Sequence, residues 1–200
     1  MAIHLIRHGE TALNAARVLQ APDTPLSENG LDQAARLGAR LADEGITRIL
    51  SSDYARARMT AEAIAATTGI AIEQTPLLRE RNFGDLRGRA YADLGFDPFH
   101  GDYAPPNGES WTVFHERVDR AWVHVTAAGA ETRGHLAVVT HGLVCGSVVD
   151  RIVEAGEQDA AAGYGWMNTS LTVLDATPPW TVRLFNCAAH LDHAEAKGPA

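Results

Sequence analysis

Three polar side chains that could carry chemistry follow apolar segments of the sequence. His8, preceded by Arg7, comes directly after the apolar run at the start of the chain, and His141 follows another run in its second half. Arg56 lies shortly after a third run. Such runs are typical of buried strands, and ligands of parallel sheets bind beyond the carboxyl ends of the strands. We therefore expect these side chains to meet at one edge of a sheet.

These residue types suit phosphoryl transfer. A neutral imidazole is a nucleophile toward phosphorus and needs no metal. A transferring phosphoryl group carries its charge on oxygens that must be neutralised, and arginines do this with paired donors. A poor leaving group also needs a proton from a carboxylic acid with a raised pKa. A site built from Arg7, His8, Arg56, His141 and a carboxylate of the segment after residue 75 would meet all three needs.

Strands alternate with helices along the chain, and this order must position the polar residues. We expect strands at Ala2–Ile6, Arg48–Ser51, Ile70–Glu73, Leu136–Thr140, Ser170–Leu174 and Thr181–Phe185. We expect one helix over Gly142–Glu154 and three others whose caps are Ser27, Asp53 and Ser110, the last with Val113 facing inward. The alternation predicts a three-layer α/β/α sandwich with a mostly parallel central sheet.

The segment at about 76–108 breaks this alternation. It is long for a connection and rich in proline, and such segments are usually functional or mobile. With 200 residues the chain is expected to form one domain over 1–200, with this segment as a cap-like insertion. The insertion has aromatic side chains that could receive an apolar or aromatic part of a substrate: Phe83, Tyr91, Phe96, Phe99 and Tyr103.

Composition excludes several classes of protein. A net charge of −8 argues against a nucleic-acid partner. We expect no membrane partner, because no apolar stretch reaches ~20 residues, and no signal peptide, because the start lacks a charged region before an apolar run. Two cysteines favour a reducing, cytoplasmic location. No two histidines have metal-ligand spacing, so we expect neither a metal nor another cofactor.

Several motifs, in order along the chain, resemble those of the histidine phosphatase superfamily, which has the phosphoglycerate mutase-like fold. The stretch Arg7-His8-Gly9-Glu10-Thr11, followed by Asn14, resembles the opening motif of that family. Later matches are Ser51-Ser52-Asp53 with Arg56, Leu78-Arg79-Glu80 with Phe83-Gly84, Gly108-Glu109-Ser110 with Arg117, Val138-Val139-Thr140-His141-Gly142, and Asn168-Thr169-Ser170. The ordered set is far more specific than any one motif.

The resemblance implies a role for each matched residue. His8 would become phosphorylated, and Glu80 would protonate the leaving alcohol and then activate the water that cleaves phosphohistidine. The phosphoryl oxygens would be held by Arg7, Arg56, His141 and Asn14. The implied partner is a small phosphorylated substrate, and the implied assembly is a monomer or homodimer. Gln20 stands where the family often has a glutamine near the phosphate, although the usual glycine neighbour is Ala21 here, and His190 is left without a role.

Two other functions stay open beside a phosphatase. One is a mutase that returns the phosphoryl group to its substrate; the absence of lysine from the insertion favours hydrolysis instead. The other is a non-catalytic phosphate-binding regulatory module, which would dispense with a nucleophile and an acid. If Glu80 is not the acid, Asp85 and Glu109 are the next carboxylates to consider.

Overall fold

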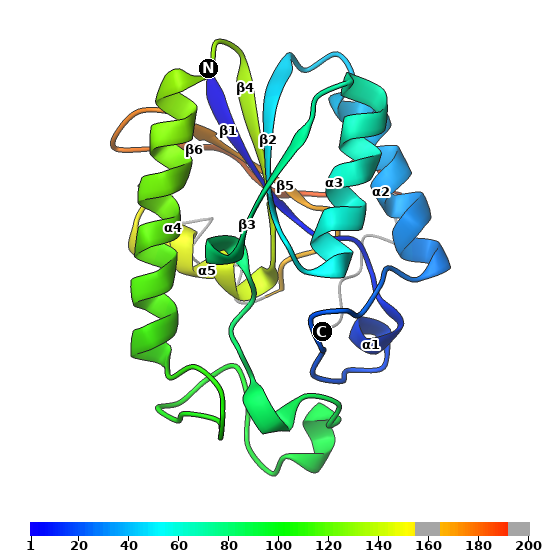
Figure 1. Cartoon of the computed structure of the whole chain (residues 1–200), viewed down its shortest axis with the longest axis vertical. Helices are drawn as coiled ribbons and strands as arrows, with labels where there is room; N and C mark the ends of the chain where they lie inside the picture. The colour runs from blue at the N-terminus through cyan, green and yellow to red at the C-terminus, as the bar shows by residue number, and fades with distance from the viewer. Residues whose placement is uncertain (155–164, 192–200) are drawn as a thin grey trace.

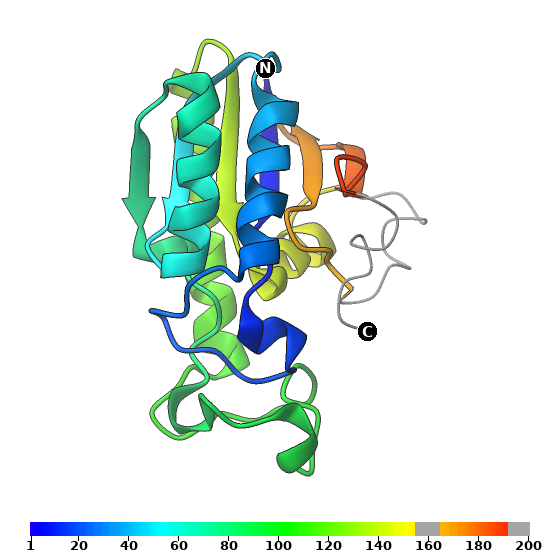
Figure 2. The ribbon, with the colours of Figure 1, turned by 90° about the vertical axis from the view of Figure 1, so that its right-hand side faces the viewer.

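The computed structural model describes residues 1–154 and 165–191, and it arranges them in three layers (Figures 1 and 2). The strands are β1 (Ala2–Arg7), β2 (Ile46–Ser52), β3 (Ile72–Thr75), β4 (His135–Thr140), β5 (Leu171–Asp175) and β6 (Val182–Cys187). The α-helices are α1 (Ala12–Ala15), α2 (Glu28–Leu41), α3 (Ala55–Thr68), α4 (Trp111–Glu131) and α5 (Gly142–Arg151). Short 3-10 turns occur at Pro76–Leu78, Gly84–Leu86 and Tyr91–Asp93.

The strands form one sheet in the order β3-β2-β4-β1-β5-β6. The first four are mutually parallel, whereas β5 and β6 run antiparallel to their neighbours. Helices α2 and α3 cover one face of the sheet, and α4 and α5 cover the other (Figure 1). The expected α/β/α sandwich with a mostly parallel sheet is therefore confirmed.

Each face of the sheet has its own apolar core, because successive strand residues point to opposite faces. In β1, Ile3 and Leu5 pack with α4 and α5, whereas Ile6 packs with α2 and α3. In β4, Val138 packs on the side of α4 and α5, and Val139 packs on the side of α2 and α3. All of these side chains are buried, so the ends of the two central strands are fixed from both sides.

The register between β1 and β4 determines where the two predicted histidines lie. Arg7 pairs with Thr140, so His8 and His141 are the next residues along two neighbouring parallel strands. Helix α2, the first long helix after β1, covers one face of the sheet, and α5, the helix after β4, covers the other (Figure 1). Such a switch point opens a crevice beyond the strand ends.

Four local expectations were wrong. Asp53 does not cap α3: the N-cap residue is Tyr54, and Asp53 instead binds the Arg79 guanidinium at 2.7 and 2.5 Å. Val113 does not face inward: it is 49% exposed. Helix α5 ends at Arg151, and Glu154 forms backbone hydrogen bonds with the turn before β6. Strand β3 also begins two residues later than expected.

The segment between β3 and α4 projects past the carboxyl ends of the parallel strands, beside α1 (Figures 1 and 2). Backbone hydrogen bonds join Leu19 to Gly88 and Arg89 and so connect the segment to the loop after α1. Inside it, the buried Arg81 donates to three carbonyl groups and stacks 4.0 Å from the Trp111 ring. The segment therefore forms one wall above the strand ends.

Candidate active site

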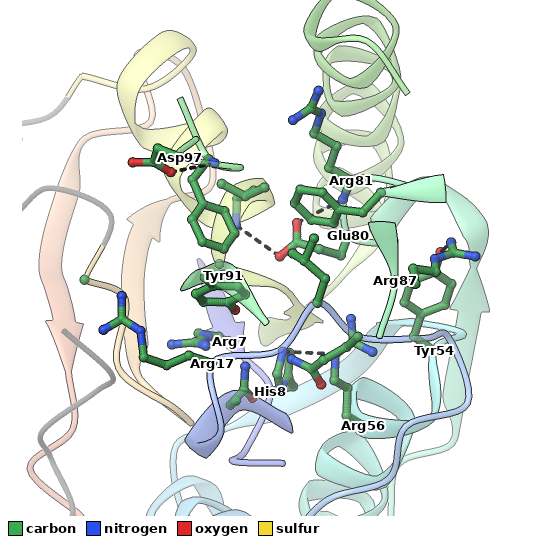
Figure 3. Close-up of a pocket in the computed structure, with 18 of the residues that line it drawn as sticks. Arg7, His8, Arg17, Tyr54, Arg56, Glu80, Arg81, Arg87, Tyr91 and Asp97 are labelled. Atoms are coloured by element: carbon green, nitrogen blue, oxygen red, sulfur yellow. Dashed lines mark hydrogen bonds between the residues drawn. The ribbon is translucent and has the colours of Figure 1, made fainter. Parts of the chain in front are cut away.

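A pocket of about 660 Å³ lies at the crevice beyond β1, and Figure 3 shows most of its lining. Five of the six predicted site residues line it: Arg7, His8, Asn14, Arg56 and Glu80. The sixth, His141, lies behind His8 and is fully buried. The fold thus gathers residues from β1, α1, α3 and the projecting segment around one cavity.

The hydrogen bonds of His8 define which ring nitrogen is free to react. Its Nδ1 atom lies 2.7 Å from the Gly9 carbonyl oxygen, which can only accept, so Nδ1 carries the proton. Nε2 then keeps its lone pair and accepts from Nε of Arg56 at 3.2 Å. Burial, followed by the nearby charges of Arg56 and Arg7, holds the pKa of His8 well below its usual value. At neutral pH the ring is uncharged, with Nε2 as its nucleophilic atom.

The backbone around His8 is tightly held. The Asn168 side chain and the Thr169 amide both donate to the His8 carbonyl oxygen at 3.2 Å. The Gly9 amide donates to the Thr60 hydroxyl at 3.0 Å. A Cβ atom on Gly9 would lie 2.7 Å from the Gly30 carbonyl oxygen, so the close approach of these two loops requires glycine. These contacts fix the direction of the His8 side chain.

His141 packs edge-on against His8, with 5.1 Å between ring centroids and 60° between ring planes. Its Nε2 atom lies 2.9 Å from the Ser52 hydroxyl. Its buried Nδ1 atom has no hydrogen-bond partner within residues 1–154 and 165–191. Burial and the Arg56 charge hold its pKa well below the usual value, so this ring is also neutral. Contact between His141 and a phosphoryl oxygen stays a prediction.

Arg7 and Arg56 bring two buried positive charges to the pocket. Arg56 donates to the Ala21 carbonyl at 3.1 Å, and burial lowers its pKa to about 10. Arg7 donates to the Trp166 carbonyl, and burial lowers its pKa as well. Neither forms an ion pair with a carboxylate in the part of the chain that the structure describes. Buried charges are normally paired, so this arrangement favours a bound anion.

Glu80 supplies a carboxyl group to the same pocket (Figure 3). Its two oxygens accept from the backbone amides of Arg81, at 3.0 Å, and Leu143, at 3.3 Å. Burial raises its pKa, although these hydrogen bonds and the Arg56 charge act in the opposite direction. A raised pKa is the property that a general acid requires.

The two alternative acids do not line the pocket. Glu109 binds Arg117 through both oxygens at 2.8 Å, and hydrogen bonds from Arg117 and the Asn82 amide outweigh burial and lower its pKa. Asp85 accepts from the Asn107 side chain in a loop outside the pocket. Glu80 is therefore the carboxyl group best placed to meet a ligand of His8.

Arg117 holds the segment that carries Glu80. From α4 it donates to the carbonyl oxygens of Leu77, Arg79 and Glu80 at distances of 2.7 to 3.2 Å. Its ion pair with Glu109 completes a nearly buried cluster. The backbone at Glu80 is thus held by Arg117, and the Glu80 side chain accepts from backbone amides and not from the neighbouring arginine side chains.

Asn14 and Gln20, near each other in sequence, both face the cavity. The Thr11 hydroxyl lies 3.2 Å from Oδ1 of Asn14 and 2.8 Å from Oε1 of Gln20. Each amide group thus has its oxygen near Thr11, which leaves the amide nitrogen able to donate. His190 lies outside the pocket, between Arg40 at 3.1 Å and the Thr169 hydroxyl at 3.0 Å.

Sequence reasoning missed Tyr54 and Arg87. The Tyr54 ring lies 5.2 Å from the Arg56 guanidinium and 5.4 Å from the Arg79 guanidinium. The Tyr54 hydroxyl accepts from Arg87 at 3.5 Å, and both residues line the pocket. Tyr54 stands inside a matched motif, which was the available signal; nothing in the sequence places Arg87.

Residues 1–154 and 165–191 contain no group of three or more histidine, cysteine, aspartate or glutamate side chains placed to hold a metal ion. No helix among them is long and apolar enough to cross a membrane.

The chain is similar to proteins of one known family. The model of the histidine phosphatase superfamily (branch 1) matches residues 3–187. A protein of Erwinia tasmaniensis named "Probable phosphoglycerate mutase GpmB" is 34% identical over 163 residues, which is 76% of this chain and 75% of that protein. A Yersinia pestis protein of the same name is 31% identical and covers 96% of this chain, with 95% of its own length matched.

Solved structures give the same relationship. A Thermus thermophilus protein is 32% identical, with a TM-score of 0.68 over 92% of this chain and 98% of its own. A mycobacterial glucosyl-3-phosphoglycerate phosphatase, solved with VO3, is 26% identical, with a TM-score of 0.76 over 93% of this chain and 99% of its own. The family model matches residues 3–187 of this chain, and the two named relatives are each more than 30% identical to it. This chain therefore belongs to the histidine phosphatase superfamily.

Proposed function

We propose that the protein hydrolyses a phosphate monoester through a phosphohistidine intermediate on His8, without a metal ion. The observation that carries the proposal is the neutral His8 ring, whose Nε2 atom faces a pocket that also holds two buried arginines, neither of which has a carboxylate partner among the described residues. A phosphate dianion would satisfy both arginines and bring phosphorus to Nε2. The vanadate named with the mycobacterial phosphatase supports an oxyanion site in such a fold.

In the first step, Nε2 of His8 attacks phosphorus as the bond from phosphorus to the ester oxygen breaks. Glu80 donates its proton to that oxygen, so the leaving group departs as an alcohol and Glu80 becomes a carboxylate. Arg7 and Arg56 neutralise the charge on the equatorial oxygens, with Asn14 and His141 as further contacts. No group outside the chain and the substrate is needed.

In the second step, a water molecule attacks the phosphohistidine. Glu80 takes a proton from the water, the bond between nitrogen and phosphorus breaks, and His8 regains its neutral ring. Inorganic phosphate then leaves, and Glu80 is again protonated. The raised pKa of Glu80 suits both directions of proton transfer.

A mutase is the second candidate, because several relatives carry the name phosphoglycerate mutase. In that reaction the phosphohistidine is attacked by a hydroxyl of the bound substrate in place of water. The absence of lysine from residues 76–108 still favours hydrolysis. A purely regulatory phosphate-binding module has less support, since the pocket holds both a nucleophile and an acid.

One experiment separates these functions. The purified protein is incubated in chelator-treated buffer with an aryl phosphate and, separately, with a phosphoglycerate, while phosphate release and isomer formation are measured. Hydrolysis predicts phosphate release from the aryl ester, abolished in His8→Ala and kept in His124→Ala, an exposed histidine outside the pocket. Isomer formation without phosphate release would assign the mutase reaction. Full activity of His8→Ala, or loss of wild-type activity through chelation alone, would contradict the phosphohistidine mechanism.

A further inference from the structure

The pocket carries more positive charge than the proposed phosphate site uses. Arg7 and Arg56 are the arginines beside His8, and Arg81 is occupied by carbonyl groups of its own segment. Arg87 also lines the pocket, yet it forms no ion pair with any residue that the structure describes. Its charge is close enough to contribute to the lowered pKa of Arg56. In a chain with a net charge of −8, this is an unexpected place for an unpaired cation.

Arg87 shares its side of the pocket with the Tyr54 hydroxyl. The Arg87 guanidinium donates to that oxygen at 3.5 Å, so the hydroxyl keeps its own hydrogen for another acceptor. Figure 3 places the pair on the opposite side of His8 from Tyr91 and Arg17. Together the two side chains present donors and a positive charge, and only a weak contact joins them.

The carboxylates that line the pocket do not pair with Arg87. Asp97 accepts from His100 at 2.6 Å and from the Phe99 amide at 2.8 Å. Glu80 accepts from two backbone amides and lies in the phosphate site. The charge of Arg87 is therefore available to a ligand.

The wall formed by the projecting segment is aromatic. Phe83, Tyr91 and Phe99 line the pocket, and the Phe99 ring contacts the other two edge-on, with centroids 5.0 Å from Tyr91 and 5.9 Å from Phe83. The other two aromatic residues of this segment, Phe96 and Tyr103, pack against each other and do not line the pocket. A leaving group would thus meet an apolar surface as well as the Arg87–Tyr54 pair.

We propose that Arg87 and the Tyr54 hydroxyl form a second anion-binding site, so that the enzyme prefers phosphate esters whose leaving group carries an anionic oxygen group beside an apolar or aromatic part. This inference rests on the proposed function, because it assigns the leaving-group side of the same pocket. Arginine suits such a site, since its planar fork matches a carboxylate or a phosphate with two parallel hydrogen bonds.

The test uses matched aryl phosphates. Phenyl phosphates with a carboxylate at the 3 or 4 position are compared with their neutral carbamoyl counterparts, which keep the shape and a similar leaving group. We expect the wild type to favour at least one carboxylate ester by about tenfold in kcat/KM, the effect of one good charged contact. Arg87→Gln should reduce this preference to less than twofold, and Arg87→Lys should keep part of it.

A matched variant and a binding measurement make the result decisive. Arg89→Gln removes an exposed arginine of the same segment that lies outside the pocket, and it should keep the full preference. Affinities of the esters for His8→Ala, measured by calorimetry, test the same preference without turnover. The subsite is wrong if the wild type shows no preference in either measurement, or if Arg87→Gln weakens both ester types equally. Absence of turnover with a retained binding preference would instead contradict only the proposed function.

A second phosphate on the leaving group is the other anion that this pair could bind. Phenyl phosphates that carry a phosphonate in place of the carboxylate distinguish the two. A larger preference for the phosphonate than for the carboxylate would assign a bisphosphorylated substrate, and the reverse order would assign a carboxylated one.

Discussion

Nε of Arg56 donates a hydrogen bond to Nε2 of His8 at 3.2 Å, so the atom proposed as nucleophile is occupied by the cation proposed to bind phosphate. The contact stabilises the neutral ring, because a protonated Nε2 could not accept it. A phosphate oxygen that binds Arg56 would draw this donor away and release the lone pair of His8. In the proposed mechanism, substrate binding and activation of the nucleophile would therefore be linked through one side chain.

Replacement of Arg56 should therefore change both binding and the titration of His8. Arg56→Met is expected to lower kcat/KM for an aryl phosphate by about 10²–10³-fold, the effect of removing one charge-stabilising donor. It should also raise the pKa of His8, since the Arg56 charge helps to lower it. NMR titration of the His8 ring checks the second result, and an unchanged His8 pKa would contradict the proposed link.

For an alkyl phosphate, kcat/KM should rise with pH at low pH and fall again at higher pH. His8 must be neutral, and its lowered pKa places the rising limb of kcat/KM below pH 6.5. Glu80 must be protonated, and its raised pKa places the falling limb above pH 4.5. The falling limb should weaken for a nitrophenyl phosphate, whose leaving group needs no proton. An identical falling limb for both esters would count against Glu80 as the acid.

Glu80→Gln should separate the two ester types more directly. Alkyl phosphates are expected to react about 10²–10⁴-fold more slowly, the usual range for general acid catalysis. Formation of phosphohistidine from an activated aryl phosphate should slow much less, and the intermediate should accumulate because its hydrolysis also needs Glu80. Quenching without acid, followed by detection of phosphate on His8, measures this.

Asp85→Asn is the matched control for that experiment, because it makes the same chemical change in the same segment but outside the pocket. It should leave both ester types near wild-type rates. Equal losses on both esters in Glu80→Gln, with no trapped intermediate, would contradict the acid role of Glu80.

The hydrogen bonds and the ion pair of Arg117 should stabilise the fold. Arg117→Met leaves Glu109 and three carbonyl groups without their donor in a nearly buried cluster. Breaking such a pair costs about 3–5 kcal/mol, and we expect the free energy of unfolding to fall by about this amount. Arg58→Met, which breaks an exposed pair with Glu62, should change it by less than about 1 kcal/mol. Urea denaturation measures the free energy of unfolding of both variants. Similar decreases in the two would contradict the stabilising role of Arg117.

The sequence alone determined the layer architecture and predicted which polar residues lie at the carboxyl ends of the strands. Apolar runs followed by Arg7-His8 and by His141 fixed the strand ends, since a buried parallel strand must be apolar and its carboxyl end must open toward ligand. The motif around Glu80 identified a carboxyl group that lines the pocket. These features are local in sequence, so their residue types and spacing carry the information.

Only the tertiary structure decided how these residues interact. The 3.2 Å contact between Arg56 and His8 depends on how α3 lies beside the residues that follow β1, across 48 positions of sequence. Asp53 was expected to cap α3, but Arg79, from a segment 26 positions away, competes successfully for its carboxylate. The position of Arg87 beside Tyr54 likewise follows from the course of an irregular segment without periodic pattern. Charged side chains choose partners by proximity in space, and local pattern does not encode that proximity.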